Sequence, residues 1–302
     1  MTLAFLISAH TDPIHLARLL KSLPEDAAFF IHVDLKTDLT PFLPLAEDPR
    51  VHLLRRRINV VWGSIRQVEY QMELIREALS TGPFHRLIAI SGLDYPLWSN
   101  TRIVKFFSHL GDRELLQGIR MTHQGTAAAN YRRYRWLNAH PWKPGTMANQ
   151  LRVALQWLIY GAGFRKPLSF RSQGVEYHLH KGASWWGISG ELAAYVLHEW
   201  DTNERLVNYF STAFCPDETF IQTVAFNSRF ASRCLLQEGR YTSLAALTPL
   251  TYIDYDPVIK VLTEEDWPVL QQSGKMFCRK TMTGTSDALL DRIDRERQFS
   301  TL

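Results

Sequence analysis

Short apolar runs alternate with amphipathic stretches along the first third of the chain. The runs are nearly continuous and are bounded by polar or turn residues, which is typical of buried strands. They cover residues 3–9, 27–33, 51–54 and 86–91. Asp12-Pro13 is a helix-start signal between the first two runs. Strands that alternate with helices predict an α/β fold, with a Rossmann-like mixed sheet flanked by helices.

Helical periodicity is clearest over residues 65–79, where apolar side chains recur on one face. We expect Ser64 to cap this helix, because a serine oxygen can accept a hydrogen bond from a free N–H of the first turn. We likewise expect Asn100 to cap a shorter helix over 100–110. Residues 115–121 have the pattern of an edge strand.

Length and composition are those of an ordinary globular protein. The 302 residues are 46% hydrophobic and 21% charged, which suits one α/β domain over 1–302. A net charge of +4 is compatible with an anionic substrate or a membrane surface, but is too small to indicate nucleic acid. The three cysteines form neither a disulfide nor a zinc pattern, which favours a reducing compartment. Because no apolar run resembles a signal peptide or approaches spanning length, we expect a cytoplasmic protein.

Acidic residues follow two of the predicted strands. Asp34 closes the second strand, a place where nucleotide-binding sheets often hold a ribose hydroxyl. Asp94 lies in the turn after the strand at 86–91. The glycine-rich dinucleotide fingerprint is missing after the first strand, so a nucleotide is indicated but NAD is disfavoured.

A second acidic feature, Pro216-Asp217-Glu218, precedes an apolar helix face formed by Phe220, Ile221 and Val224. Proline suits the first turn of a helix, and carboxylates there meet the positive end of its dipole. One interpretation is therefore N-terminal capping. The other is that one carboxylate is a catalytic base in a cleft.

Residues 123–170 interrupt the α/β pattern with basic and aromatic residues. Tyr131-Arg132-Arg133-Tyr134-Arg135-Trp136 is the densest part, and an apolar helix face follows over 151–159. Such interleaving is compatible with single-stranded nucleic acid, with an acceptor or membrane surface, or with simple packing. The small net charge leads us to expect no nucleic-acid partner.

Six stretches, taken in order, resemble one family: the core 2/I-branching N-acetylglucosaminyltransferases, glycosyltransferase family 14, which also contains peptide O-xylosyltransferases. Each stretch alone is weak, but their order and spacing over residues 4 to about 281 are specific. They are Ala4-Phe5-Leu6-Ile7 with Phe30-Ile31-His32-Val33-Asp34, Val61-Trp62-Gly63-Ser64, Ile90-Ser91-Gly92-Leu93-Asp94-Tyr95-Pro96-Leu97, Lys181-Gly182-Ala183-Ser184-Trp185-Trp186, Pro216-Asp217-Glu218 and Phe277-Cys278-Arg279-Lys280.

This resemblance implies a GT-A-type fold and transfer of a sugar from a UDP-sugar with inversion. Glu218 matches the family's general base, which takes the proton of the attacking acceptor hydroxyl. Asp217 would cap the helix and orient it. Other UDP-sugar transferases of the same family, xylosyltransferases included, remain an alternative, and so does a non-catalytic nucleotide- or glycan-binding module.

The resemblance also implies a donor site that works without a metal ion or another cofactor. Most GT-A enzymes hold a metal with Asp-x-Asp after the central strand, but here only Asp94 stands at that position. Basic side chains must then meet the charge that grows on the diphosphate. Lys280 matches the family's diphosphate lysine, and Arg279 and Lys260 are further candidates. Asp34 matches the acid that holds uridine, and Trp62 lies in another matching donor-site stretch.

The acceptor side is matched less closely. Arg133 and Tyr134 correspond to a basic and aromatic pair near the family's acceptor region, and Trp185 and Trp186 are expected on the wall of the same cleft. A glycan or a lipid-linked saccharide is the expected acceptor. The expected division is a nucleotide-binding half, 1–121, and an acceptor and catalytic half, 122–302. Because the anchor and many cysteines of animal members are missing, we expect a bacterial, cytoplasmic relative with at most peripheral contact with the inner face of a membrane.

Overall fold

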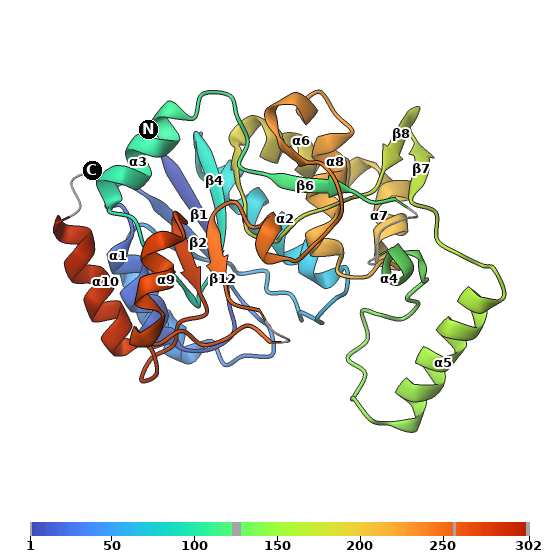
Figure 1. Ribbon diagram of the computed structural model, residues 1–302, viewed down its shortest axis with the longest axis horizontal. Helices are drawn as coiled ribbons and strands as arrows, with labels where there is room; N and C mark the ends of the chain where they lie inside the picture. Colours follow the sequence, from blue (N-terminus) through green and yellow to red (C-terminus); the bar gives the residue numbers. More distant parts are fainter. Residues whose placement is uncertain (1, 123–127, 256–257, 300–302) are drawn as a thin grey trace.

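A five-stranded sheet lies at the centre of the computed structural model, which describes residues 2–122, 128–255 and 258–299. The strand order is β10-β4-β1-β2-β3, in which β10 is antiparallel to β4 and the other pairs are parallel. The strands are β1 (Leu3–Ala9), β2 (Ala28–Val33), β3 (Val51–Leu53), β4 (Arg86–Ser91) and β10 (Gly187–Ser189). The predicted mixed sheet flanked by helices is confirmed (Figure 1).

Both faces of this sheet are buried, because alternate side chains of each strand point to opposite faces. In β1, Phe5 and Ile7 join a core with α1, α3, α9 and α10, whereas Leu6 joins a second core with α2, α6, α7 and α8. The strands are therefore continuous apolar runs rather than alternating ones. The helices are α1 (Pro13–Ser22), α2 (Arg66–Thr81), α3 (Asn100–His109), α6 (Gly190–Thr202), α7 (Glu204–Ser211), α8 (Phe220–Phe226), α9 (Trp267–Gln272) and α10 (Asp287–Phe299).

Three smaller sheets surround the central one: β11-β6-β9, β12-β13-β5 and the hairpin β7-β8. Their strands are β5 (Asp94–Pro96), β6 (Gln117–Arg120), β7 (Ser169–Ser172), β8 (Val175–His178), β9 (His180–Lys181), β11 (Leu235–Gln237), β12 (Thr251–Ile253) and β13 (Phe277–Arg279). The expectation of an edge strand over 115–121 is wrong in one respect, because β6 lies between β11 and β9. Both partners come from much later in the chain, and local sequence does not reveal such pairing.

The residues that cap the helices agree with the predicted ones at α1 and differ by one position at α3 and α2. Asp12 caps α1 as predicted, and its Oδ1 accepts from His15 N at 3.0 Å. Ser99, not Asn100, caps α3, since its Oγ accepts from Arg102 N at 3.4 Å. The helix after Ser64 begins at Arg66, one residue later than expected. Ser64 Oγ nevertheless accepts from Arg66 N, an N–H of the first turn, at 3.3 Å, as predicted.

The basic and aromatic segment contains α4 (Ala128–Arg132) and α5 (Met147–Gly161), and Figure 1 shows α5 extending away from the rest of the molecule. Five short 3₁₀ segments complete the described elements: η1 (Thr40–Glu47), η2 (Pro216–Glu218), η3 (Ala231–Arg233), η4 (Ala245–Leu247) and η5 (Glu264–Asp266). Across residues 2–122, 128–255 and 258–299, no helix combines the length and the apolar character needed to cross a membrane.

Candidate active site

A cavity of about 600 Å³ opens at the carboxyl ends of β1, β2 and β4. Ser8 and Ala9 of β1, Asp34 just after β2 and Ser91 at the end of β4 all line it. Open α/β sheets bind ligands at this edge, where the strand ends leave a crevice. The second half of the chain supplies the opposite walls, including the segment that carries Asp217 and Glu218.

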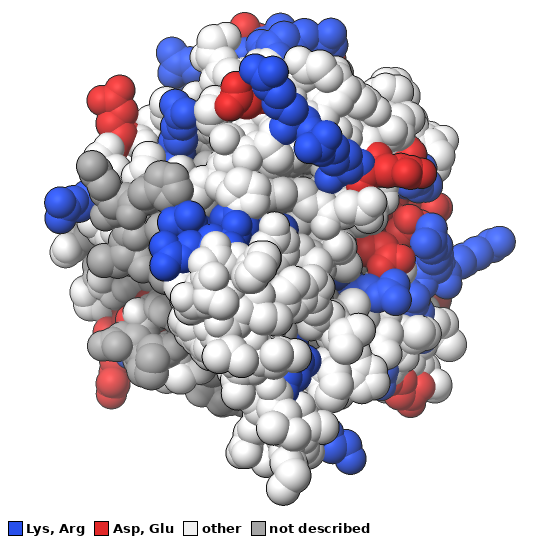
Figure 2. Space-filling view, turned by 90° about the vertical axis from the view of Figure 1, so that its right-hand side faces the viewer, with Lys and Arg blue, Asp and Glu red and all other residues white. Residues whose placement is uncertain are grey.

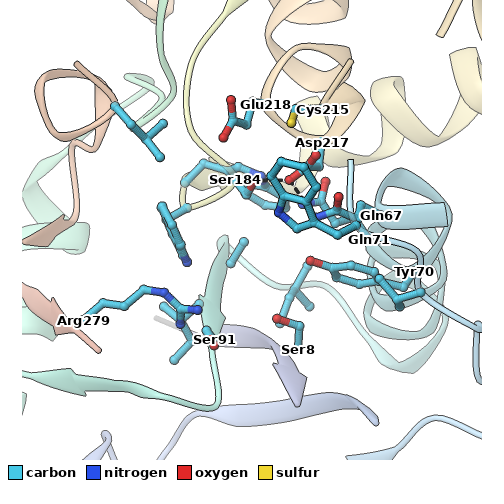
Figure 3. Close-up of a pocket in the computed structure, with 18 of the residues that line it drawn as sticks. Ser8, Gln67, Tyr70, Gln71, Ser91, Ser184, Cys215, Asp217, Glu218 and Arg279 are labelled. Atoms are coloured by element: carbon cyan, nitrogen blue, oxygen red, sulfur yellow. Dashed lines mark hydrogen bonds between the residues drawn. The ribbon is translucent and has the colours of Figure 1, made fainter. Parts of the chain in front are cut away.

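The two adjacent carboxylates sit in a 3₁₀ turn, η2, rather than in the first turn of a long helix. The α-helix α8 begins only after Thr219, and η2 has no side-chain cap. The expected capping by Asp217 is therefore wrong. Its Oδ2 instead accepts from Ser184 Oγ at 2.6 Å and from Gln67 Nε2 at 3.1 Å, both on the cavity wall (Figure 3).

Asp217 is held in an environment that disfavours its charge. Burial and the neighbouring charge of Glu218 raise the pKa of Asp217 to about 7, although the hydrogen bond from Ser184 acts in the opposite direction. Its Oδ1 is buried and has no hydrogen-bond partner in the structure. This carboxyl group thus gains or loses a proton near neutral pH.

Glu218 has a different partner, Lys181 of β9, which is buried. Lys181 Nζ donates to Glu218 Oε2 and, at 2.7 Å, to Tyr131 Oη. Burial alone would lower the pKa of Lys181, but the charges of Glu218, Tyr131 and Tyr241 raise it above its usual value. The two neighbouring carboxyl groups therefore differ in their partners, because a buried ammonium contacts Glu218 whereas only neutral donors contact Asp217.

Arg279 at the end of β13 extends into the cavity from the side opposite the two carboxylates (Figure 3). Its Nη1 donates to Asp94 Oδ1 at 2.9 Å, and its guanidinium lies 5.2 Å from the ring centroid of Trp185. The expectation that Asp94 itself binds the nucleotide sugar is not met, because Asp94 is fully buried outside the cavity lining and instead holds Arg279 in this ion pair. The ion pair fixes one end of the guanidinium, while its Nε is buried without a partner.

Asp34 lines the cavity near His10. Its Oδ1 accepts from Lys36 N at 3.0 Å, which fixes the carboxylate at the end of β2. The pKa of His10 is lowered by burial and by the charges of Arg279 and Lys280, with Asp34 opposing them. The charges of Asp34, Arg279 and Lys280 thus all act on His10, at one end of the cavity.

Several buried polar atoms of the lining lack a partner. Among the residues that the structure describes, they include Asp217 Oδ1, Arg279 Nε, Trp186 Nε1 and Gln71 Oε1. Unpaired buried polar atoms are rare in folded proteins and call for an explanation. All four belong to residues that line the cavity, so polar groups without partners are concentrated around it.

Of the remaining donor-site candidates, Trp62 lines the cavity, whereas Lys280 and Lys260 do not. Trp62 lines its rim and is 74% exposed, with its edge against Phe214. Lys280 lies just outside the lining, next to Arg279. Lys260 is turned away, since its Nζ pairs with Asp266 Oδ1 at 2.6 Å.

The acceptor-site candidates divide in the same way. Trp185 and Trp186 both line the cavity, although Trp186 is buried in the core beneath it. Arg133 and Tyr134 lie outside the lining: the Arg133 guanidinium stacks on Trp157, with 4.1 Å to the ring centroid, and Tyr134 stacks on Trp136. The contact between Arg133 and Trp157 joins α5 to the segment that precedes it.

Sequence reasoning missed several lining residues: Lys181, Ser184 and Gln67, which contact the carboxylates, and Tyr131, which contacts Lys181. Lys181 and Ser184 stand in the stretch 181–186 that the family motifs single out, so a signal for them existed. Tyr131 and Gln67 have no local pattern that marks them. Among the described residues, no three His, Cys, Asp or Glu side chains come together in a way that could hold a metal ion.

Comparison with known families identifies the family of this chain. The family described as Core-2/I-Branching enzyme matches residues 3–267, which is most of the chain. This chain belongs to the Core-2/I-branching enzyme family. Membership confirms the resemblance seen in the sequence motifs and indicates a glycosyltransferase, a class that uses a nucleotide-sugar donor and a glycan acceptor.

Two relatives are each named xylosyltransferase sqv-6. The protein from Caenorhabditis briggsae is 23% identical over 227 residues, and that from Caenorhabditis elegans is 23% identical over 222 residues. The matches cover 71% of this chain but only 25% of each relative, so the chain spans about a quarter of their length. A solved structure, mannose-1-phosphate geranyltransferase from Thermus thermophilus, matches 80% of this chain and 75% of its own with 11% identity and a TM-score of 0.35, too low to bear on function.

Proposed function

We propose that this member of the Core-2/I-branching family transfers a sugar, N-acetylglucosamine in the first instance, from a UDP-sugar to a glycan hydroxyl, with inversion and without a metal ion. The observation that carries the proposal is the opposition of a carboxylate and a cation across one cavity: Glu218 on one side and Arg279 on the other. Inverting transfer needs a base at the acceptor and a positive charge at the leaving group.

Glu218 is the proposed general base. Its carboxyl group lines the cavity and is held by Lys181, where it can accept the proton of the acceptor hydroxyl as that oxygen attacks the anomeric carbon. A single displacement needs no nucleophile on the protein, because the leaving UDP is stable as an anion. Asp217 is a positioning residue that ties η2 to Ser184 and Gln67.

The donor site is proposed at the opposite end of the cavity. Asp34 holds the uridine portion, and Arg279 with Lys280 meets the diphosphate. Negative charge grows on the diphosphate as the C–O bond breaks, and a fixed guanidinium stabilises it without reorganising. The ion pair of Arg279 with Asp94 supplies that fixed position.

A xylosyl donor is the second candidate, favoured by the two relatives named xylosyltransferase. The two donors differ in their 2-substituent and C6 group, and both fit the same chemistry at Glu218. Thermal shift with UDP-N-acetylglucosamine and UDP-xylose separates them, since a ligand that binds the folded state raises the melting temperature. No shift with either donor, with UDP, or with acceptor present would leave only the alternative of a non-catalytic glycan-binding module.

The test of mechanism is Glu218→Gln. We expect transfer to fall by at least about a thousandfold while UDP binding stays near wild type, because the base acts on the acceptor and not on the donor. Radiolabelled sugar transfer and calorimetry with UDP measure the two effects. Glu204→Gln, a change at an exposed glutamate of α7, is the matched control. Full activity of the Glu218 variant would remove this residue from the mechanism.

A further inference from the structure

The helix α5 packs with its polar side toward the protein. Gln156 is buried, and its Nε2 donates to the carbonyl oxygen of Trp136 at 3.3 Å. Arg152 lies on the same side, where its Nη2 donates to Asn149 Oδ1 at 2.8 Å and its guanidinium stacks on Trp142. A helix on the surface of a globular protein normally buries its apolar side instead.

The apolar side of α5 consequently faces outward. Met147, Leu151, Leu155 and Leu158 recur at helical spacing, and their exposed fractions are 76%, 64%, 54% and 70%. Leu137, Trp157 and Phe164, in or near the same segment, are also exposed. We call Met147, Leu151, Leu155 and Leu158 the α5 face. An exposed apolar patch of contiguous large side chains marks an interaction surface.

Positive charge surrounds the α5 face. Residues 115–175 contain nine Lys and Arg and no Asp or Glu, although the whole chain has 34 Lys and Arg and 30 Asp and Glu. Lys143 before the helix and Arg165 after it are both exposed. Figure 2, which looks onto this side of the molecule, shows a large uncharged area with Lys and Arg side chains around it and Asp and Glu side chains among them on the right. The partner of this surface is therefore both apolar and anionic.

Aromatic side chains complete the surface and hold it rigidly. Trp157 packs against the Arg133 guanidinium, and Tyr160 carries the Arg165 guanidinium with 4.9 Å to the ring centroid. Tryptophan, leucine and phenylalanine beside lysine and arginine are the composition of helices that lie in a membrane interface.

We propose that the α5 face binds the surface of a bilayer that contains anionic phospholipids, with α5 lying in the plane of the interface. The helix has 15 residues and is thus about 22 Å long, shorter than the roughly 30 Å hydrocarbon layer, so it lies on the bilayer and does not cross it. A second copy of the chain is a poorer occupant, because two such basic segments repel each other. This proposal stands on α5 alone and does not depend on the proposed reaction.

The test is cosedimentation of the full chain with vesicles made of phosphatidylglycerol and phosphatidylcholine, or of phosphatidylcholine alone. We expect binding to the anionic vesicles, weakened by added salt because screening shortens the reach of the charges. The triple variant Leu151→Glu/Leu155→Glu/Leu158→Glu should lower the partition coefficient at least about tenfold. The matched control changes three exposed apolar residues elsewhere: Leu43→Glu/Leu236→Glu/Val269→Glu.

The outcomes are distinguishable. Loss of binding in the α5 triple variant, with the control variant binding like wild type, supports the proposal. A second variant, Lys143→Glu/Arg165→Glu, keeps the apolar face and should weaken binding to anionic vesicles, which covers a triple variant that fails to fold. Equal loss in both triple variants overturns the proposal. So does a wild-type chain that stays in the supernatant with both vesicle types, or that binds neutral vesicles equally well. A dimer that the α5 changes convert to a monomer would assign the face to a second copy.

Discussion

Two adjacent carboxyl groups, Asp217 and Glu218, are held in different electrostatic surroundings. Glu218 has a buried ammonium as its partner, whereas Asp217 has only neutral hydrogen-bond donors, Ser184 and Gln67. Neighbouring carboxyl groups in different surroundings typically divide the work of a site. This difference in partners distinguishes Glu218, the proposed base, from Asp217, whose raised pKa makes its titration measurable.

That titration predicts a pH-dependent stability difference for Asp217→Asn. An acid whose pKa rises on folding binds its proton more tightly in the folded state, so its contribution to stability is present below its ordinary pKa and is lost as pH rises toward about 7. Asparagine does not titrate. Relative to wild type, the variant should therefore gain about 2 kcal/mol in free energy of unfolding between about pH 5 and pH 8.

Urea unfolding at both pH values measures this difference. Asp201→Asn is the matched control, because hydrogen bonds from Arg76 lower the pKa of Asp201 and place its titration below this range. The difference between that control and wild type should be the same at both pH values. A flat difference for Asp217→Asn as well would show that the carboxyl at 217 does not titrate near neutrality.

At the scale of elements, β9 is fixed by a close approach to its neighbours. Gly182 follows β9, and its N–H donates to the carbonyl oxygen of Glu218 at 2.7 Å. A Cβ at this position would lie 2.2 Å from the carbonyl oxygen of Gln117 and 2.8 Å from Gln222 Nε2. Only glycine lets β6, α8 and η2 pack this closely around Lys181.

We therefore expect Gly182→Ala to lower the free energy of unfolding by about 1–3 kcal/mol, because the backbone must shift to relieve the overlap. Transfer should fall as well, since the shift moves Lys181 relative to Glu218. Thermal unfolding and initial rates measure both effects. Gly161→Ala is the control, because nothing lies within 4 Å of a Cβ there. Unchanged stability of the Gly182 variant would contradict the close packing.

The elements also show how far sequence alone can go. Strands β1, β2 and β4 were predictable because a strand buried on both faces is a continuous apolar run. The strand β6 was predicted, but its place between β9 and β11 was not, and neither were β9 and β11, because this pairing depends on contacts far apart in the chain. Likewise Glu218 and Asp34 stand in recognisable stretches, whereas Tyr131 reaches Lys181 only through the tertiary fold.

At the scale of the molecule, the two expected halves of the chain share their sheets. β10 completes the central sheet beside β4, and β13 pairs with β5. The cavity is likewise lined from both, with Asp34 on one side of the division and Arg279 on the other. The segment that leads to α5 contributes Tyr131 to the same cavity.

The proposed donor site predicts that the diphosphate and the uridine contribute separately to binding. Lys280→Ala should lower the affinity for UDP by about tenfold and the affinity for uridine by less than about twofold. The reason is that a lysine contact with phosphate is charge-assisted and uridine carries no phosphate. Calorimetry with both ligands, in the presence of a chelator, measures the two affinities, and Lys105→Ala on α3 is the control. Equal losses for UDP and uridine would contradict a diphosphate contact. UDP binding or transfer that disappears with chelator would overturn the proposal that side-chain cations replace a metal ion.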